Sequence, residues 1–285
     1  MTSPFVAVAG ATGQLGPVRL NTDPSRTAAL RECGVNIIPV DLADQRRLTQ
    51  ELTGATCVVS TLQGLANVIH TAQGTLLDAA VAARVPRFIP SDFALDFTKT
   101  QPGSNRNLDL RRQFHQALEQ APIASTSIFN GGFMGLIGSD SPMVNHKKGK
   151  VMYVGSATQL LDLTTIADTA AYTAAVAADT NPTPRFLRIA GDVISAQGIA
   201  DAAGQVYGKT YQPSWMGSVG FLEGGIRVLR LFGGQDQIMP VWQGMQYMAN
   251  IFSGTGKLDP LDNDRYPELK WTKVVDFLQE EKNKR

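Results

Sequence analysis

The chain has 285 residues, of which 43% are hydrophobic and 18% charged, enough for one large α/β domain or a domain with a smaller appendage. Lys and Arg number 26 against 25 Asp and Glu, and the resulting net charge of +1 argues against direct nucleic-acid binding. No apolar run approaches the roughly 18–20 residues that cross a bilayer, and the N-terminus has no signal-peptide pattern. We therefore expect a cytoplasmic globular protein without a membrane segment.

Two cysteines, Cys33 and Cys57, lie in apolar surroundings. Isolated cysteines of this kind are typical of reduced core residues more than of a disulfide. Neither has metal-ligand spacing with His70, His115 or His146, so we expect no metal site.

Short apolar runs alternate with segments of helical periodicity in the first half of the chain. The first run, 5–9, is continuously apolar and ends in glycine, which is typical of a strand buried on both faces. This alternation predicts βαβ units and a Rossmann-type, doubly wound parallel sheet. The other predicted strands are 35–40, 56–61, 86–90 and 124–129, and the predicted helices are 25–32, 45–52, 66–83 and 107–120.

The pattern changes after Gly131 and predicts a smaller α/β region. Ser195 is suited to cap a helix that Gly208 ends, and Thr165 is suited to cap the helix before it. We expect a dinucleotide-binding core at 1–130 and a substrate-side region at 131–285, packed as one unit. The predicted strands here are 151–154 and 186–189, and the predicted helices are 164–178, 195–207, 222–232, 239–252 and a charged helix end at 276–285.

One connection is missing from this pattern. Gly16 is followed directly by the strand-like run 17–20, although a parallel crossover needs roughly a dozen residues, usually as a helix. Either a segment of about 15 residues is absent from this sequence, or the protein lacks its first helix and has a damaged nucleotide site. We favour the first explanation, which a Gly16–Pro17 Cα separation far above about 3.8 Å would support.

Gly10, Gly13 and Gly16 follow the first predicted strand with the spacing G-x-x-G-x-x-G. Glycines let the backbone turn sharply and approach a pyrophosphate, whose oxygens then accept backbone N–H bonds. A purely structural glycine turn is the alternative, because a glycine triplet alone is a weak signal.

Four motifs occur in a characteristic order: GATGQLG at 10–16, VDLAD at 40–44, FIPSDF at 88–93 and FNGGF at 129–133. In this order the chain resembles the NmrA-like family of atypical short-chain dehydrogenases, which includes isoflavone reductase-like enzymes. The resemblance implies NADP(H) in preference to NAD(H), and reductase activity.

The resemblance also implies which residues contact the cofactor. The family's usual arginine for the ribose 2′-phosphate is replaced by Thr22, and Arg26 is placed to reach that phosphate, whereas Asp23 opposes it. Asp92 is equally suited to be a helix cap or a turn residue. The expected contacts are Gly10, Thr12, Gly13, Gln14, Leu15, Gly16, Asn21, Thr22, Arg26, Asp41, Leu42, Thr61, Leu62, Gln63, Ser91, Asp92, Phe93 and Asn130.

Catalytic residues are harder to assign. The lysine that the family carries before its sixth strand is replaced here by Arg111. Arginine stays charged and is a poor proton donor. His115, one helical turn later, is a second candidate for proton transfer, although a lone helical histidine is more often structural.

Two functions remain open. One is hydride transfer from NADPH to an apolar or quinone- or enone-like small molecule, which needs positioning and exclusion of water. The other is an NADP(H)-sensing regulatory protein that controls a protein partner, favoured by the loss of the lysine. Either is expected as a monomer or homodimer.

Overall fold

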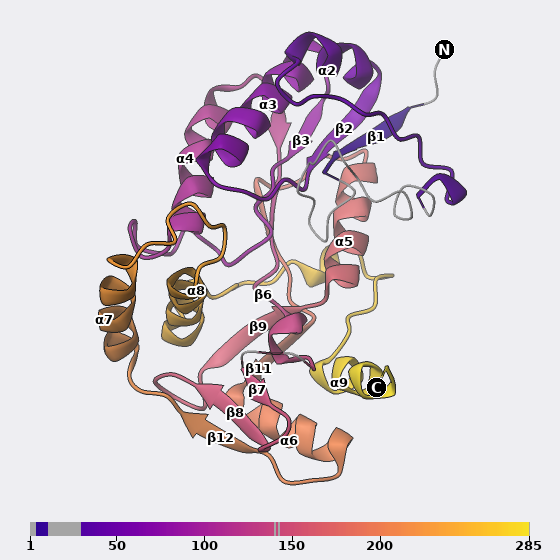
Figure 1. Cartoon of the computed structure of the whole chain (residues 1–285). Helices are drawn as coiled ribbons and strands as arrows, with labels where there is room; N and C mark the ends of the chain where they lie inside the picture. The colour runs from indigo at the N-terminus through magenta and orange to yellow at the C-terminus, as the bar shows by residue number, and fades with distance from the viewer. Residues whose placement is uncertain (1–3, 11–29, 140, 142, 285) are drawn as a thin grey trace. The chain divides into compact units, whose positions relative to one another are not determined.

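The computed structural model describes residues 4–10, 30–139, 141 and 143–284. It divides into two compact units, which we treat separately (Figure 1). The N-terminal unit consists of Met1–Asp92, Leu110–Ser127 and Val176–Arg185. The C-terminal unit consists of Phe93–Asp109, Ile128–Ala175 and Phe186–Arg285. Each unit thus takes in segments from both halves of the chain.

A four-stranded sheet forms the centre of the N-terminal unit. Its strands run in the order β1 (Phe5–Ala9), β2 (Ala55–Ser60), β3 (Arg87–Ile89) and β4 (Ala124–Ser125), and every neighbouring pair is parallel. The helices α2 (Gln45–Leu52), α3 (Gln73–Ala82) and α4 (Arg106–Gln120) lie along one side of the sheet (Figure 1). This confirms the predicted Rossmann-type parallel sheet.

Local sequence explains these helices. Asp44 caps α2 by accepting a 2.9 Å hydrogen bond from the Arg47 N–H, and Leu48 and Leu52 are buried on its inner face. A π-helical segment, Asn67–Ala72, leads into α3, so the predicted helix 66–83 is present with an irregular first half. The buried side chains of α3 and α4 pack with those of β2 and β3 in one hydrophobic cluster.

The predicted strand 35–40 is wrong. Its backbone pairs with no strand in the described part of the chain, and Val35 and Ile38 are exposed. An apolar run becomes a strand only when a neighbour pairs with its backbone, and none of the described strands does so here. Of the predicted helix 25–32, residues 30–32 are helical, and the rest lies outside the described residues. The strand-like run 17–20 and the Gly16–Pro17 junction also lie outside them.

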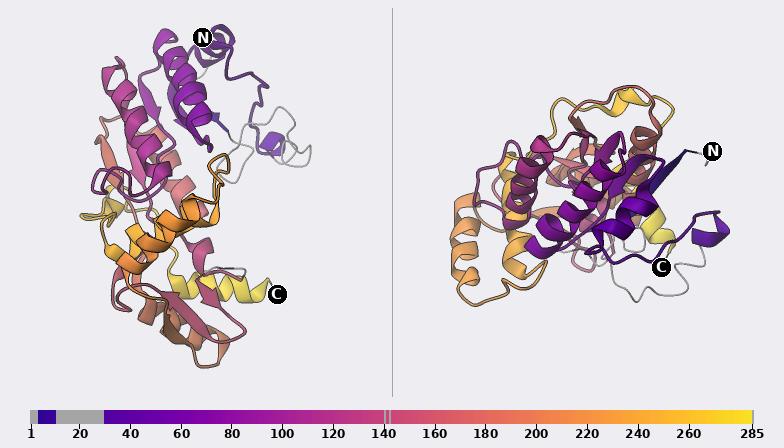
Figure 2. Two further views of the ribbon diagram at one scale, coloured as in Figure 1. Left: turned by 60° about the vertical axis from the view of Figure 1, so that its left-hand side comes forward. Right: turned by 90° about the horizontal axis from the view of Figure 1, so that it is seen from above.

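The C-terminal unit contains two three-stranded sheets, β11-β9-β6 and β12-β8-β7, and the strand pair β10-β5. The strands are β5 (Ser127–Phe129), β6 (Gly132–Phe133), β7 (Val144–Asn145), β8 (Lys150–Tyr153), β9 (Leu160–Thr164), β10 (Phe186–Arg188), β11 (Asp192–Ser195) and β12 (Gln212–Trp215). The helices are α5 (Ile166–Ala178), α6 (Ala196–Tyr207), α7 (Val219–Arg230), α8 (Val241–Ser253) and α9 (Val274–Asn283), with short 3₁₀ turns at Met134–Ile137 and Asn263–Arg265 (Figure 2).

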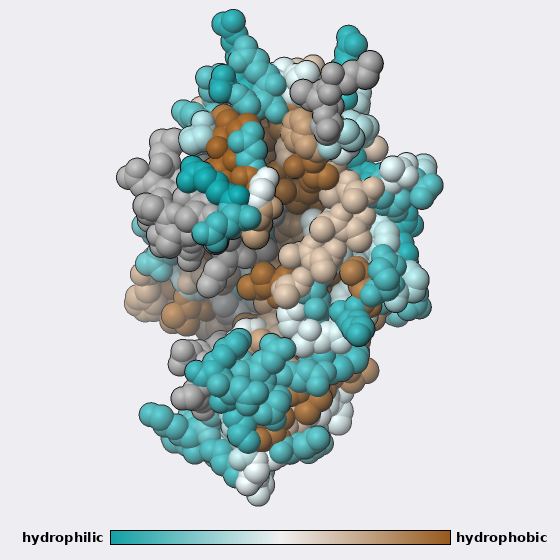
Figure 3. All heavy atoms as spheres, turned by 90° about the vertical axis from the view of Figure 1, so that its right-hand side faces the viewer, coloured by the Kyte–Doolittle hydropathy of each residue, from teal (hydrophilic) through white to brown (hydrophobic). Residues whose placement is uncertain are grey.

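The predicted caps of these helices are confirmed. The Ser195 side chain accepts from Gly198 N–H, and Gly208 ends α6 with a φ of 66°. Thr165 Oγ1 accepts a 2.9 Å bond from Asp168 N–H at the start of α5. The surface over α9 is largely hydrophilic, which fits a charged last helix (Figure 3).

Both cysteines are free, but they occupy different environments. Cys57 on β2 is fully buried, and burial raises the pKa of its thiol from the ordinary 9.0 to about 11 although nearby Arg87 opposes this. Cys33 is exposed, so its assignment to the core is wrong. Among the described residues, no group of His, Cys, Asp and Glu has the arrangement of a metal site, and no helix is long and apolar enough to cross a membrane.

Candidate functional site

The candidate site lies at the carboxyl ends of β1, β2 and β3 in the N-terminal unit. In a parallel sheet these ends meet at one edge, where ligands of doubly wound folds bind. Thr61, directly after β2, donates from both its N–H and its Oγ1 to the carbonyl oxygen of Ala9, at 2.9 and 3.0 Å. Gly10 follows with a φ of 88°, a conformation that favours glycine and turns the chain away from the strand.

Two buried polar atoms at this edge have no hydrogen-bond partner among the residues that the structure describes: Ser60 Oγ at the end of β2 and Asp92 Oδ1 just after β3. The two strands pair in register Val59↔Ile89, so both atoms lie within three residues of one ladder position. An unsatisfied buried polar atom costs about 1–3 kcal/mol. Such atoms at the ligand-binding edge of a sheet therefore indicate groups whose hydrogen bonds are completed by a bound molecule.

The other oxygen of Asp92 is firmly held. Asp92 Oδ2 lies 2.6 Å from His115 Nε2, and both side chains are buried. Ser127 Oγ lies 3.3 Å from the same nitrogen, and Arg185 Nη2 lies 3.4 Å from His115 Nδ1. Because a guanidinium only donates, Nδ1 is the acceptor in this contact and the ring proton belongs on Nε2, facing Asp92. His115 thus orients Asp92 and does not open onto solvent.

Ser91 is fixed from two sides. Its N–H donates to Gln73 Oε1 at 3.0 Å, and its carbonyl oxygen accepts from Arg111 Nε at 3.0 Å. Arg111 is nearly buried, and its guanidinium is bound to the main chain at the end of β3. The structure therefore brings Ser91, Asp92, Arg111 and His115 together.

Sequence reasoning missed Gln73, which is fully buried and lies at the start of α3, directly after the π-helical segment. That segment also carries His70, whose Nε2 lies 3.0 Å from the Leu110 carbonyl oxygen. π-helical turns are frequent at functional sites, but no residue pattern announces them. Gln73 could have been found only by asking which polar residue breaks the apolar face of the predicted helix 66–83.

Several predicted contacts have local structural roles or lie elsewhere. Asp41 Oδ1 accepts from Ala43 N–H at 3.0 Å, which closes the turn before α2, and Leu42 packs against the core cluster. After Thr61, Leu62 is fully buried and Gln63 is half-buried. The predicted contacts outside the described residues are Thr12, Gly13, Gln14, Leu15, Gly16, Asn21, Thr22 and Arg26.

Phe93 and Asn130 belong to the C-terminal unit, and both are buried. The main-chain N–H of Asn130 donates to Ala94 O at 3.0 Å, and its carbonyl oxygen accepts from Thr164 Oγ1 at 2.7 Å. Neither polar atom of its side-chain amide has a partner in the described part of the chain. The backbone of Asn130 is thus fixed, while its side chain has the same unsatisfied character as Ser60 and Asp92.

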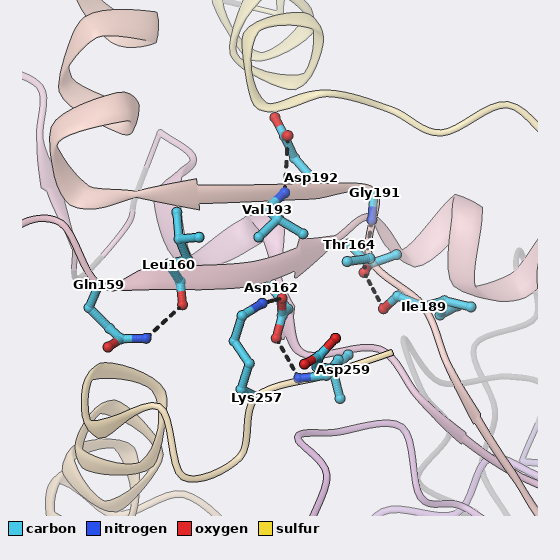
Figure 4. Close-up of polar contacts among 12 residues, drawn as sticks. Gln159, Leu160, Asp162, Thr164, Ile189, Gly191, Asp192, Val193, Lys257 and Asp259 are labelled. Atoms are coloured by element: carbon cyan, nitrogen blue, oxygen red, sulfur yellow. Dashed lines mark hydrogen bonds and ion pairs between the residues drawn. The ribbon is translucent and has the colours of Figure 1, made fainter. Parts of the chain in front are cut away.

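The glycine after Asn130 is required by close packing. Gly131 has a φ of 68°, and a Cβ there would lie 2.3 Å from the Asp162 carbonyl oxygen. Asp162 itself is held on β9 by Lys257 and by the Leu258 N–H, the latter at 2.7 Å (Figure 4). The close approach of β9 therefore requires glycine at the first glycine position of the FNGGF motif.

Comparisons with known proteins identify the family. The model of the NmrA-like family matches residues 17–278, beginning directly after the glycine-rich turn. No curated protein sequence matches the chain. The fold is similar to that of AtPrR2 with NADP+ and (+)pinoresinol, at 19% identity and a TM-score of 0.79, covering 96% of this chain and 97% of the other.

Two further solved structures share the fold. One comes from a study of pinoresinol-lariciresinol and phenylcoumaran benzylic ether reductases, with 19% identity, a TM-score of 0.80 and coverage of 98% and 99% of the two chains. The other is the complex of leucoanthocyanidin reductase with NADPH from Vitis vinifera, with 17% identity, a TM-score of 0.78 and coverage of 97% and 98%. The family model matches most of this chain, and this match shows that the chain belongs to the NmrA-like family.

Proposed function

We propose that this protein is an NADP(H)-dependent oxidoreductase that transfers hydride from NADPH to an apolar, quinone- or enone-like small molecule. The observation that carries the proposal is the pair of unsatisfied buried atoms, Ser60 Oγ and Asp92 Oδ1, at the ends of neighbouring parallel strands. The cofactors named for the similar folds, NADP+ in one and NADPH in another, support the choice of nucleotide.

The residues present fit such a cofactor. Gly10 begins the glycine-rich turn that would hold the pyrophosphate, and Arg26 carries the positive charge suited to a 2′-phosphate. Thr61 and Ser91–Asp92 supply polar groups at the strand ends. When bound, NADPH supplies the hydride, and the protein's task is to orient it and exclude water.

The proton that accompanies the hydride comes from solvent or from the substrate in this proposal. Arg111 is bound to the Ser91 carbonyl oxygen and stays charged, so it acts as a fixed cation. His115 is buried and acts through Asp92, whose carboxylate it orients. We therefore propose positioning roles for Arg111 and His115 in place of direct proton transfer.

Turnover tests this proposal. NADPH oxidation is followed by absorbance with a panel of quinones, enones and imines, and we expect at least one to be reduced. Arg111→Lys, which restores the family's residue, is expected to raise kcat, whereas Asp92→Asn is expected to lower it by about tenfold or more. No oxidation with any acceptor, by a protein shown to bind NADPH, would contradict the proposal.

A second candidate is NADP(H) sensing without turnover. The observation that favours it is that Arg111 replaces the family's lysine and is engaged with the main chain. In that case NADPH binds but no acceptor is reduced, and a protein partner binds the NADP+ and NADPH forms with different affinity.

A further inference from the structure

The helix α7 has apolar side chains on two opposite faces. On one face Val219, Leu222 and Ile226 pack with Trp242 and other residues of α8, and the two helices lie side by side in both figures that show them (Figures 1 and 2). On the other face Phe221, Val228 and Leu231, the residue that directly follows the end of α7, are 74%, 55% and 83% exposed. These three are spaced as residues i, i+7 and i+10, which places them in one stripe along the helix.

A surface helix normally carries one apolar stripe, and a helix that is apolar on both sides is normally covered on both. Phe232, directly after the stripe, is also 83% exposed. Contiguous apolar surface of this kind marks an interaction site. The question is which occupant suits the outer face of α7.

Two features of α7 point to an identical helix. Gly224 lies in the middle of the stripe, and a Cβ there would meet no atom within 4 Å, so it leaves a flat, open site for a neighbouring side chain. Glu223 and Arg227 both lie on one flank of the stripe. In an antiparallel helix pair related by a two-fold axis, the same flanks face each other, so such a pair of charges is self-complementary.

We propose that the outer face of α7 packs antiparallel against the same face of α7 in a second copy of this chain, with the two-fold axis crossing at the level of residue 226 along the helix. This register places Phe221 opposite Leu231 of the second copy and Val228 over Gly224. Glu223 then lies within about 3 Å, measured along the axis, of the level of Arg227 in the other copy. Each contact occurs twice by symmetry, and the apolar stripe is buried along its whole length.

Sedimentation equilibrium of the full chain tests the proposal. We expect the wild-type protein to be a dimer and Val228→Glu to be a folded monomer by circular dichroism. Leu160→Glu on β9, an apolar position in the same unit that is 47% exposed, is the matched control and is expected to stay dimeric. A wild-type protein that remains monomeric, or a Val228→Glu variant that remains dimeric, would overturn the proposal.

Two further variants test the geometry itself. Gly224→Leu fits the isolated helix, because its surroundings are open, yet it blocks the close approach and is expected to weaken the dimer by about tenfold or more. Glu223→Arg and Arg227→Glu are each expected to weaken it, and the double exchange to restore it. If none of these substitutions changes the affinity of the dimer, the dimer forms through another surface and the proposal is wrong. Binding of the monomer to phosphatidylserine vesicles through this stripe would likewise overturn the proposal and assign the face to a membrane.

Discussion

β1 and β2 are neighbouring parallel strands of similar apolar composition, yet β1 is largely exposed and β2 is largely buried. Val8 of β1 is 48% exposed, whereas its partner in register, Val59 of β2, is 3% exposed. On β1 only Ala7 and Ala9 pack against the core cluster. Because the two valines project from the same face of the sheet, the difference lies in what covers them and not in the strands themselves.

This difference agrees with the expectation that a crossover is missing after Gly16. A helix that connects β1 to a further parallel strand packs on the face of the sheet, and the sequence has a strand-like run in place of a helical pattern directly after Gly16. β1 is also the last strand of its sheet among the described residues, so it is paired along one edge. The half of the sheet nearest the glycine turn is therefore the less protected half.

The largest expected contrast comes from a charge placed in either strand. Val59→Asp buries an unpaired carboxylate and is expected to lower the free energy of unfolding by about 4 kcal/mol or more. Val8→Asp, its neighbour in register, is expected to cost less than about 1 kcal/mol because its side chain reaches water. Urea unfolding measures both, and equal losses would show that β1 is covered after all.

Cys57 makes β2 sensitive to alkaline pH. Its pKa is raised by burial from 9.0 to about 11, so the unfolded chain ionises first and stability is lost as pH rises from 9 to 11. The loss attributable to this thiol is about 2–3 kcal/mol. Cys57→Val is expected to flatten the pH dependence of urea unfolding in this interval, whereas Cys33→Ser leaves it unchanged. An identical slope in the wild type and Cys57→Val would refute burial of this thiol.

Adding a crossover helix after Gly16 should reduce the difference in burial between β1 and β2. Insertion of an amphipathic, helix-forming segment of about 15 residues between Gly16 and Pro17 is expected to raise the free energy of unfolding by about 1–3 kcal/mol, as it covers Val6 and Val8. A glycine- and serine-rich insertion of equal length is the control and is expected to give no gain. Equal effects of the two insertions would mean that β1 needs no helix.

Thiol labelling compares the accessibility of β1 and β2 with the least change to the protein. In a Cys33→Ser background, Cys57 is expected to react with a disulfide reagent only after local opening, whereas an added Val8→Cys thiol reacts directly. We expect the second reaction to be at least about 100-fold faster. Similar rates would indicate that β1 and β2 are equally protected.

Much of this fold is predictable because local signals agree with it. Continuous apolar runs locate β1, β2 and β3, and Ser195 and Gly208 mark both ends of α6. The failure at 35–40 has a tertiary cause, since a run of strand-forming residues says nothing about whether a neighbouring strand exists.

The candidate site, too, is predictable only in part. Asp92 and His115 were both candidates, but their 2.6 Å contact joins residues 23 positions apart and has no periodic signature. Arg185 reaches His115 from 70 positions away, and the role of Gln73 depends on a π-helical irregularity. Residue types and strand ends are visible in sequence, whereas the partners that orient them are products of packing.

The central claim is that the edge formed by β1, β2 and β3 holds a nicotinamide dinucleotide with a 2′-phosphate. Titration of the purified protein with NADPH and with NADH, followed by cofactor fluorescence, tests it most directly. We expect saturable binding of NADPH, weaker binding of NADH, and loss of affinity in Asp92→Asn. A fluorescence signal unchanged by the folded wild-type protein with either nucleotide would contradict the claim.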